Sequence, residues 1–151
     1  MNEAETKLFL NASSTPGGNT ARLAHLFYGG EPYSTLNLVD YRIDQLGQKS
    51  EGDQYDQVER TIGKASFIAI GTPVYWSDMT GLLKTWIDRH EHVDNRYAGI
   101  GLVALVQGSA PEDAIGSINH VFDHFAQRFS LDYHGVRTFD NASRLDYQNL
   151  M

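Results

Sequence analysis

Five segments of strand length alternate along the chain with four segments whose apolar residues recur at helical spacing. Three of the strand candidates are near-continuous apolar runs, as expected of strands that are buried on both faces of a sheet. The predicted strands span residues 6–12, 33–43, 66–72, 100–106 and 131–140. The predicted helices span residues 20–27, 55–64, 81–89 and 111–129, with Pro111 in the first turn of the last one.

This alternation predicts an α/β fold in which helices cover both faces of a parallel sheet. Crossovers between parallel strands are right-handed and loops are short, so few topologies remain. We expect a three-layer α/β/α arrangement with five parallel strands in the order 2-1-3-4-5. Only residues 141–151 follow the last predicted strand, so we expect a short or missing final helix.

The composition agrees with this fold and excludes several classes of function. Hydrophobic residues make up 41% of the chain and charged residues 21%, so we expect one globular domain over residues 1–151. A net charge of −7 with scattered Lys and Arg argues against nucleic-acid binding. Cysteine is absent, which excludes disulfides and thiolate metal sites. With no apolar run of about 20 residues and no signal-like N-terminus, we expect no membrane span and a cytoplasmic location.

Candidate ligand contacts come from the loops that leave the carboxyl ends of strands, because ligands of such sheets bind there, where the strand order reverses. The first loop, residues 13–20, contains three hydroxyls at Ser13, Ser14 and Thr15, followed by two glycines and the start of a helix. Hydroxyls and backbone N–H groups at a helix start favour a phosphate. The alternative is that Asn19 or Thr20 merely caps the helix.

Two further loops would reach the same edge. In the loop after the third strand, Pro73 and Val74 precede Tyr75 and Trp76, whose flat rings suit an aromatic ligand but could equally pack under a helix or at a subunit contact. The loop after the fourth strand contains Gln107, Gly108 and Ser109, where glycine permits close backbone approach. The Walker A, GxGxxG and GxSxG patterns are absent, which disfavours P-loop, Rossmann dinucleotide and α/β-hydrolase functions.

Two stretches carry a family resemblance: SSTPGGNT at residues 13–20 and GTPVYWSDMTGLLKTWIDR at residues 71–89. They resemble the NAD(P)H-dependent FMN reductases of the flavodoxin-like superfamily, and the order of elements matches over nearly the whole chain. The resemblance implies FMN as cofactor and NADH or NADPH as co-substrate. It implies hydride transfer to a quinone, another flavin or a similar small acceptor, with no catalytic side chain and no metal required.

The same resemblance implies roles for individual residues. Ser13, Thr15, Gly18, Asn19 and Thr20 would hold the FMN phosphate, although many members carry Arg where this chain has Thr15. The isoalloxazine ring would lie against four residues of the second loop and be closed on its pyrimidine side by two of the third. These are Pro73, Val74, Tyr75 and Trp76, then Gly108 and Ser109.

Alternatives and departures remain. A flavodoxin-type electron carrier, or a regulatory module on the same fold that lacks flavin, are the competing functions. The short C-terminal segment leaves an apolar sheet face for a rearranged tail or a second subunit to cover, so we expect a homodimer or larger homo-oligomer. His90, Glu91 and His92 are interpreted as a solvated turn rather than a metal site, and Lys84 and Asp88 as a surface ion pair.

Overall fold

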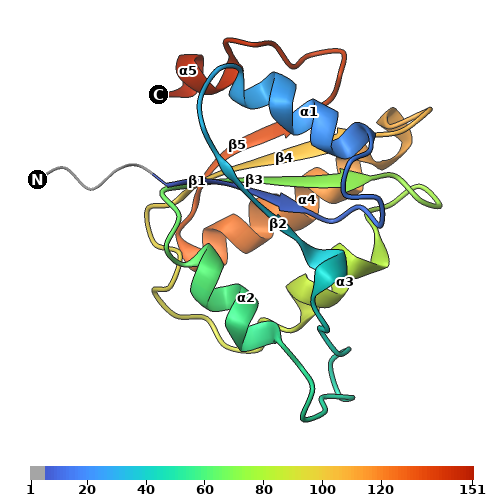
Figure 1. Ribbon diagram of the computed structural model, residues 1–151, viewed down its shortest axis with the longest axis vertical. Coiled ribbons are helices and arrows are strands. Elements are labelled where there is room, and N and C mark those ends of the chain that lie inside the picture. Colours follow the sequence, from blue (N-terminus) through green and yellow to red (C-terminus); the bar gives the residue numbers. More distant parts are fainter. Residues whose placement is uncertain (1–5) are drawn as a thin grey trace, which may run out of the picture.

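The computed structural model describes residues 6–151, which form three layers around a parallel sheet (Figure 1). One face of the sheet is covered by α1 (Asn19–Tyr28) and α5 (Asp146–Leu150). The other is covered by α2 (Tyr55–Ile62), α3 (Gly81–Asp88) and α4 (Glu112–Phe129). The predicted α/β class with a short final helix is therefore confirmed. None of the helices in residues 6–151 combines the length and apolar character that a membrane crossing requires.

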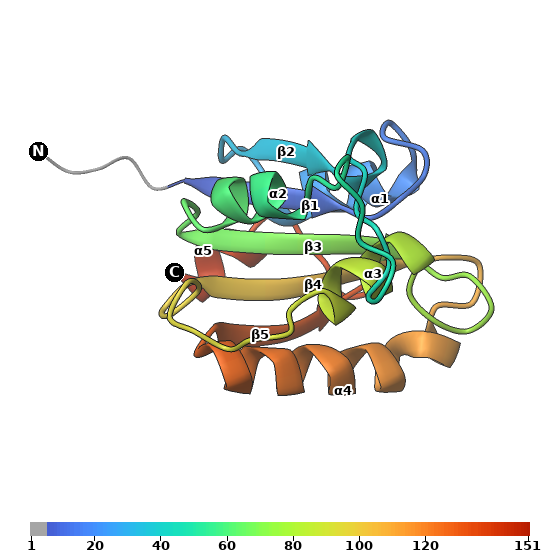
Figure 2. The ribbon, with the colours of Figure 1, turned by 90° about the horizontal axis from the view of Figure 1, so that it is seen from below.

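All five strands run parallel in the predicted order, β2-β1-β3-β4-β5, as Figure 2 shows. Their bounds are Lys7–Asn11 for β1, Ser34–Asn37 for β2, Phe67–Pro73 for β3, Gly101–Gln107 for β4 and Asp132–Arg137 for β5. Order reverses between β1 and β3, so the loops that follow these two strands diverge there and open a crevice.

Alternate residues of the central strands build two separate cores. Phe9 of β1 and Val103 of β4 face α1, while their neighbours Leu8 and Leu102 face the three-helix side. This period of two is the pleat of a strand buried on both faces, and it explains why β1, β3 and β4 read as continuous apolar runs.

The edge strands are shorter than the sequence pattern predicts. β2 ends at Asn37, opposite Asn11, the last residue of β1, and β1 is its strand partner. Past that point the chain has no strand to pair with and turns into a 3₁₀ helix, Leu38–Asp40. β5 likewise ends at Arg137 rather than at residue 140, and Pro111 is the N-cap of α4 rather than a residue within it.

The segment after β5 folds back over α1 (Figure 1). Arg137 and Asp146 join the two ends of this tail through an ion pair of 3.2 Å, and α5 buries Tyr147 against the sheet. Gly29 allows the tail backbone to approach, since it has φ +62° and a Cβ there would lie 2.3 Å from the carbonyl oxygen of Arg144. A rearranged tail thus covers part of the α1 face, while a covering subunit stays a prediction.

Candidate functional site

The loops after β1, β3 and β4 surround a pocket of about 740 Å³, within the range of small-molecule sites. Ten of the thirteen predicted site residues line it: Ser13, Thr15, Gly18, Asn19, Pro73, Val74, Tyr75, Gln107, Gly108 and Ser109. Their convergence follows from topology, because carboxyl ends of neighbouring parallel strands meet at one edge. Whether these residues bind FMN stays a prediction.

Asn11, the last residue of β1, organises the first loop. Its Oδ1 accepts from the backbone N–H of Ser13 at 3.1 Å, and its Nδ2 donates to the side-chain oxygen of Asn37 at 3.0 Å and to the carbonyl of Pro16 at 3.3 Å. The Ser13 hydroxyl then accepts from the N–H of Thr15 at 3.0 Å. These hydrogen bonds tie the first loop to the ends of β1 and β2.

The start of α1 faces the pocket without a side-chain cap. Gly18 is the N-cap residue, and among the described residues no side chain makes a capping hydrogen bond to this helix. The alternative that Asn19 or Thr20 serves as a cap is therefore not supported. Gly18 is also crowded, because a Cβ there would lie 3.3 Å from the carbonyl oxygen of Thr15. Uncapped N–H groups with a partial positive charge suit a phosphate.

The second loop is held by a chain of hydroxyls. Thr80 donates to the carbonyl of Ala12 at 2.8 Å, and its own N–H donates to the hydroxyl of Thr72 at 3.1 Å. The N–H of Val74 donates to the carbonyl of Gln107 at 2.9 Å, which ties this loop to the third. All three loops are thus fixed relative to one another, so the pocket is largely preformed.

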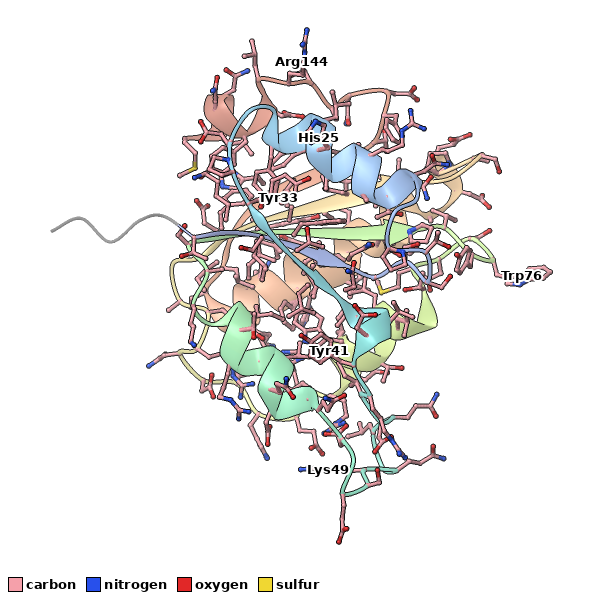
Figure 3. The ribbon with its side chains drawn as sticks, viewed as in Figure 1. His25, Tyr33, Tyr41, Lys49, Trp76 and Arg144 are labelled. Carbon is pink, nitrogen blue, oxygen red and sulfur yellow. The ribbon has the colours of Figure 1, made fainter. Side chains whose placement is uncertain are left out.

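Three predicted residues lie outside the lining. Ser14 is an exposed residue of the first loop that does not line the pocket. Thr20 is buried, and its hydroxyl accepts from the side chain of Gln107 at 3.2 Å, so it anchors α1 to the end of β4. Trp76 is fully exposed and points away from the molecule (Figure 3). It occupies a tight turn in which both Trp76 and Ser77 have positive φ, and Ser77 donates to Asp113.

Gly71, in β3 behind the pocket, allows α1 to approach the sheet. A Cβ there would lie 2.7 Å from both the ring of Phe9 and the methyl of Thr20. We expect Gly71→Ala to lower the free energy of unfolding by about 1–3 kcal/mol through overpacking, measured by urea denaturation. Gly116→Ala is the control: with open space around it in α4, it should leave stability unchanged or raise it. Equal effects of the two would contradict this account.

Two residues that the sequence reasoning missed complete the lining, Arg22 and Phe139. Arg22 lies one turn into α1, and its Nη1 donates to the side-chain oxygen of Asn19 at 3.1 Å. Arg22 follows Asn19 by three positions in a predicted helix, and this spacing could have indicated that the two side chains are neighbours. Phe139 comes from the tail after β5 and is 42% exposed. No local pattern indicated it, because its position depends on how the tail folds back.

The second half of the motif at residues 71–89 does not line the pocket, and its charged residues make structural contacts. Arg89 makes two hydrogen bonds, of 2.6 and 2.9 Å, to the carboxylate of Asp53 and so ties the end of α3 to the start of α2. This bidentate bond lowers the pKa of Asp53 below its usual value. Lys84 and Asp88 form the predicted surface pair, with Nζ and Oδ1 2.6 Å apart.

The side chain of His90 is 2% exposed, so its placement in a solvated turn is wrong, whereas Glu91 and His92 are exposed as predicted. Its Nδ1 donates to the carbonyl of Trp86 at 2.8 Å, and its Nε2 lies 2.6 Å from Oε1 of Glu59. Both ring nitrogens therefore face oxygen atoms, and the ring links the end of α3 to α2. In the described part of the chain, no group of three or more His, Cys, Asp or Glu could hold a metal ion.

Glu59 of α2 is the centre of this buried cluster. It also accepts from Arg96 at 2.8 Å, Tyr55 at 2.9 Å and Trp86 at 3.3 Å, and Tyr97 donates a further short bond. Burial by itself raises the pKa of Glu59, but the hydrogen bond and charge of His90 and the tyrosine hydroxyls outweigh it, so the pKa is lowered. The cluster lies outside the pocket lining and stabilises the three-helix side.

A family model described as NADPH-dependent FMN reductase matches residues 7–131, which include every strand except β5. The chain belongs to this family. Its members are FMN-dependent NAD(P)H oxidoreductases, so the cofactor and the oxidoreductase class predicted from the motifs are confirmed at the level of the family. Phe139 lies beyond the matched residues, whereas Arg22 lies within them.

One curated relative is YwqN of Bacillus subtilis (strain 168), which carries the provisional name of NAD(P)H-dependent FMN-containing oxidoreductase. It is 32% identical over 88 residues, or 53% of this chain. The match spans about half of that relative, 49% of its length.

Solved structures share the fold at lower identity. The Trp repressor binding protein from Bacillus subtilis is 20% identical, with a TM-score of 0.63 over 96% of this chain and 93% of its own. An NADH:FMN oxidoreductase in its apo form is 18% identical, with a TM-score of 0.61 over 90% of this chain and 74% of its own. An FMN-dependent NADH-azoreductase from Bacillus anthracis str. Ames Ancestor, in complex with FMN, is 11% identical. Its TM-score is 0.59, over 89% of this chain and 86% of its own.

Proposed function

We propose that this chain binds FMN in the pocket between the loops after β1, β3 and β4 and transfers hydride from NADH or NADPH to a quinone, a flavin or a similar acceptor. The observation that carries the proposal is the joint placement of hydroxyls, uncapped helix N–H groups and Tyr75 at the reversal of strand order. When bound, FMN supplies the two-electron chemistry, and the protein supplies position and electrostatics.

The residues present fit the two ends of the cofactor. Ser13, Thr15 and Asn19 offer donors for a phosphate beside the uncapped start of α1. Gly108 lets the third loop approach the second, since a Cβ there would lie 3.3 Å from that of Val74. Tyr75, which is half-exposed, lines the same pocket and offers a flat side chain to the ring of the cofactor. Trp76 would have to change its conformation to contact the ring.

The test is titration of the purified protein with FMN, followed by quenching of flavin fluorescence. We expect saturable quenching in the low micromolar range or below, and oxidation of NADH or NADPH when a quinone is added. Binding without turnover would favour the electron carrier. Absence of quenching at tens of micromolar FMN would favour the flavin-free module and contradict the proposal.

Two related expectations stay proposals. A homodimer or larger homo-oligomer would cover what the tail leaves open on the α1 face, and analytical ultracentrifugation at micromolar concentration tests this. A cytoplasmic location of a single-domain protein, without nucleic-acid partners, agrees with the net charge of −7.

A further inference from the structure

Arg22 differs from the other residues of the pocket lining in its charge. Among the described residues that line it, Arg22 is the one with a formal charge, although the chain as a whole has a net charge of −7. Its side chain is exposed, and the bond to Asn19 directs the guanidinium toward the start of α1, beside the first loop. The cation therefore borders the same part of the pocket as Ser13, Thr15 and Gly18.

The first loop by itself does not supply enough positive charge to neutralise a phosphate monoester. Such a group carries a charge of about −1.5 to −2 near neutral pH. The start of a helix offers the equivalent of roughly half a positive charge, and residues 8–21 contain no charged side chain. Hydroxyls and N–H groups provide hydrogen bonds but leave most of the negative charge uncompensated. An arginine supplies a full charge and two parallel donors for phosphate oxygens.

We propose that Arg22 is the phosphate-neutralising residue of this pocket and makes it select FMN over riboflavin, the same flavin without the phosphate. The inference rests on the proposed function, because it assigns one residue a role toward the cofactor. Arg22 reaches the site from within α1 rather than from the loop. Selection between the two flavins is then set by one side chain held by its hydrogen bond to Asn19.

The experiment compares the dissociation constants of FMN and riboflavin for wild type, Arg22→Gln, Arg22→Lys and Arg144→Gln, by fluorescence quenching. Arg144 lines a neighbouring groove on α1 together with Arg22 but lies outside the pocket lining, so its variant removes the same charge nearby. We expect Arg22→Gln to weaken FMN binding about 10- to 100-fold and leave riboflavin binding unchanged. Arg22→Lys should recover part of the loss, and Arg144→Gln should change the FMN constant less than about threefold.

Salt provides a second readout that does not depend on substitution. Wild-type affinity for FMN should fall as ionic strength rises, whereas riboflavin affinity should not, and Arg22→Gln should abolish most of this difference. An unchanged ratio of FMN to riboflavin affinity in Arg22→Gln, or equal losses in Arg22→Gln and Arg144→Gln, would overturn the inference while the proposed function stands. A wild-type protein that binds neither flavin would overturn both.

Discussion

Glu59→Leu is expected to lower the free energy of unfolding by at least about 3 kcal/mol at neutral pH, because it removes one partner of a buried, hydrogen-bonded ion pair. Glu59 is 8% exposed, and its carboxylate lies 2.8 Å from Nη1 of Arg96 and 2.6 Å from Nε2 of His90. Without its carboxylate, the buried donors of Tyr97 and Trp86 lose their acceptor as well. Leucine limits the cavity that alanine would leave, so the loss reports mainly on the polar partners. Urea denaturation monitored by circular dichroism measures it.

Asp88→Ala is the matched control, because it also removes the carboxylate of an ion pair on a helix. Asp88 is paired with Lys84 at the surface, where both side chains are largely exposed. Water screens such pairs, so the expected loss is below about 0.5 kcal/mol. Comparable losses in Glu59→Leu and Asp88→Ala would show that the buried cluster does not contribute as its geometry indicates.

The same cluster predicts how stability depends on pH. The pKa of Glu59 is lower in the folded protein than its ordinary value near 4.5. Its contribution is therefore fully present above that value and declines as pH falls through the lowered folded-state pKa. The difference in stability between wild type and Glu59→Leu should therefore shrink as the pH is lowered below about 4. A difference that grows on acidification would contradict this sign.

The order of strands could be predicted because β1, β3 and β4 are buried on both faces, and burial leaves an unmistakable apolar run. The pocket followed from that order, since parallel strands place their loops at one edge. Edge strands were predicted too long because apolar residues beyond Asn37, such as Tyr41 and Ile43, are partly buried without being in a strand. Apolar residues in a sequence indicate that a segment is buried. At the edge of a sheet, a buried segment need not be hydrogen-bonded to a neighbouring strand.

Some residues have roles that the sequence did not indicate, because their surroundings are set by partners far away along the chain. His90 looks polar in its local context, yet its partner Glu59 is 31 positions away and approaches it only when α2 packs beside α3. Phe139 reaches the pocket because the tail folds over α1. Thr20, which stays a predicted phosphate contact, also has a structural role that depends on such contacts, because its methyl packs against Gly71 and its hydroxyl accepts from Gln107. Sequence spacing carries no information on such contacts.

The tail is the part of the structure on which the α1 face depends most. Tyr147 is 3% exposed, and its ring centroid lies 5.1 Å from that of Phe67, 5.4 Å from Tyr28 and 6.2 Å from Phe27. One aromatic side chain from a five-residue helix therefore closes the core on this side of the sheet. The same tail contributes Phe139 to the pocket, so its attachment matters to the site as well as to stability.

Tyr147→Ala should accordingly lower the free energy of unfolding by about 3–5 kcal/mol, the cost of truncating a large buried aromatic residue. Leu145→Ala, in the same tail but 58% exposed, should cost less than about 0.5 kcal/mol and serves as the control. Hydrogen exchange should show the amides of α5 and the end of α1 losing protection in Tyr147→Ala, because Tyr147 packs against Phe27 and Tyr28. If unfolding midpoint and protection both stay at wild-type values, then Tyr147 does not close this core, and the cover of the α1 face must come from another source such as a second subunit.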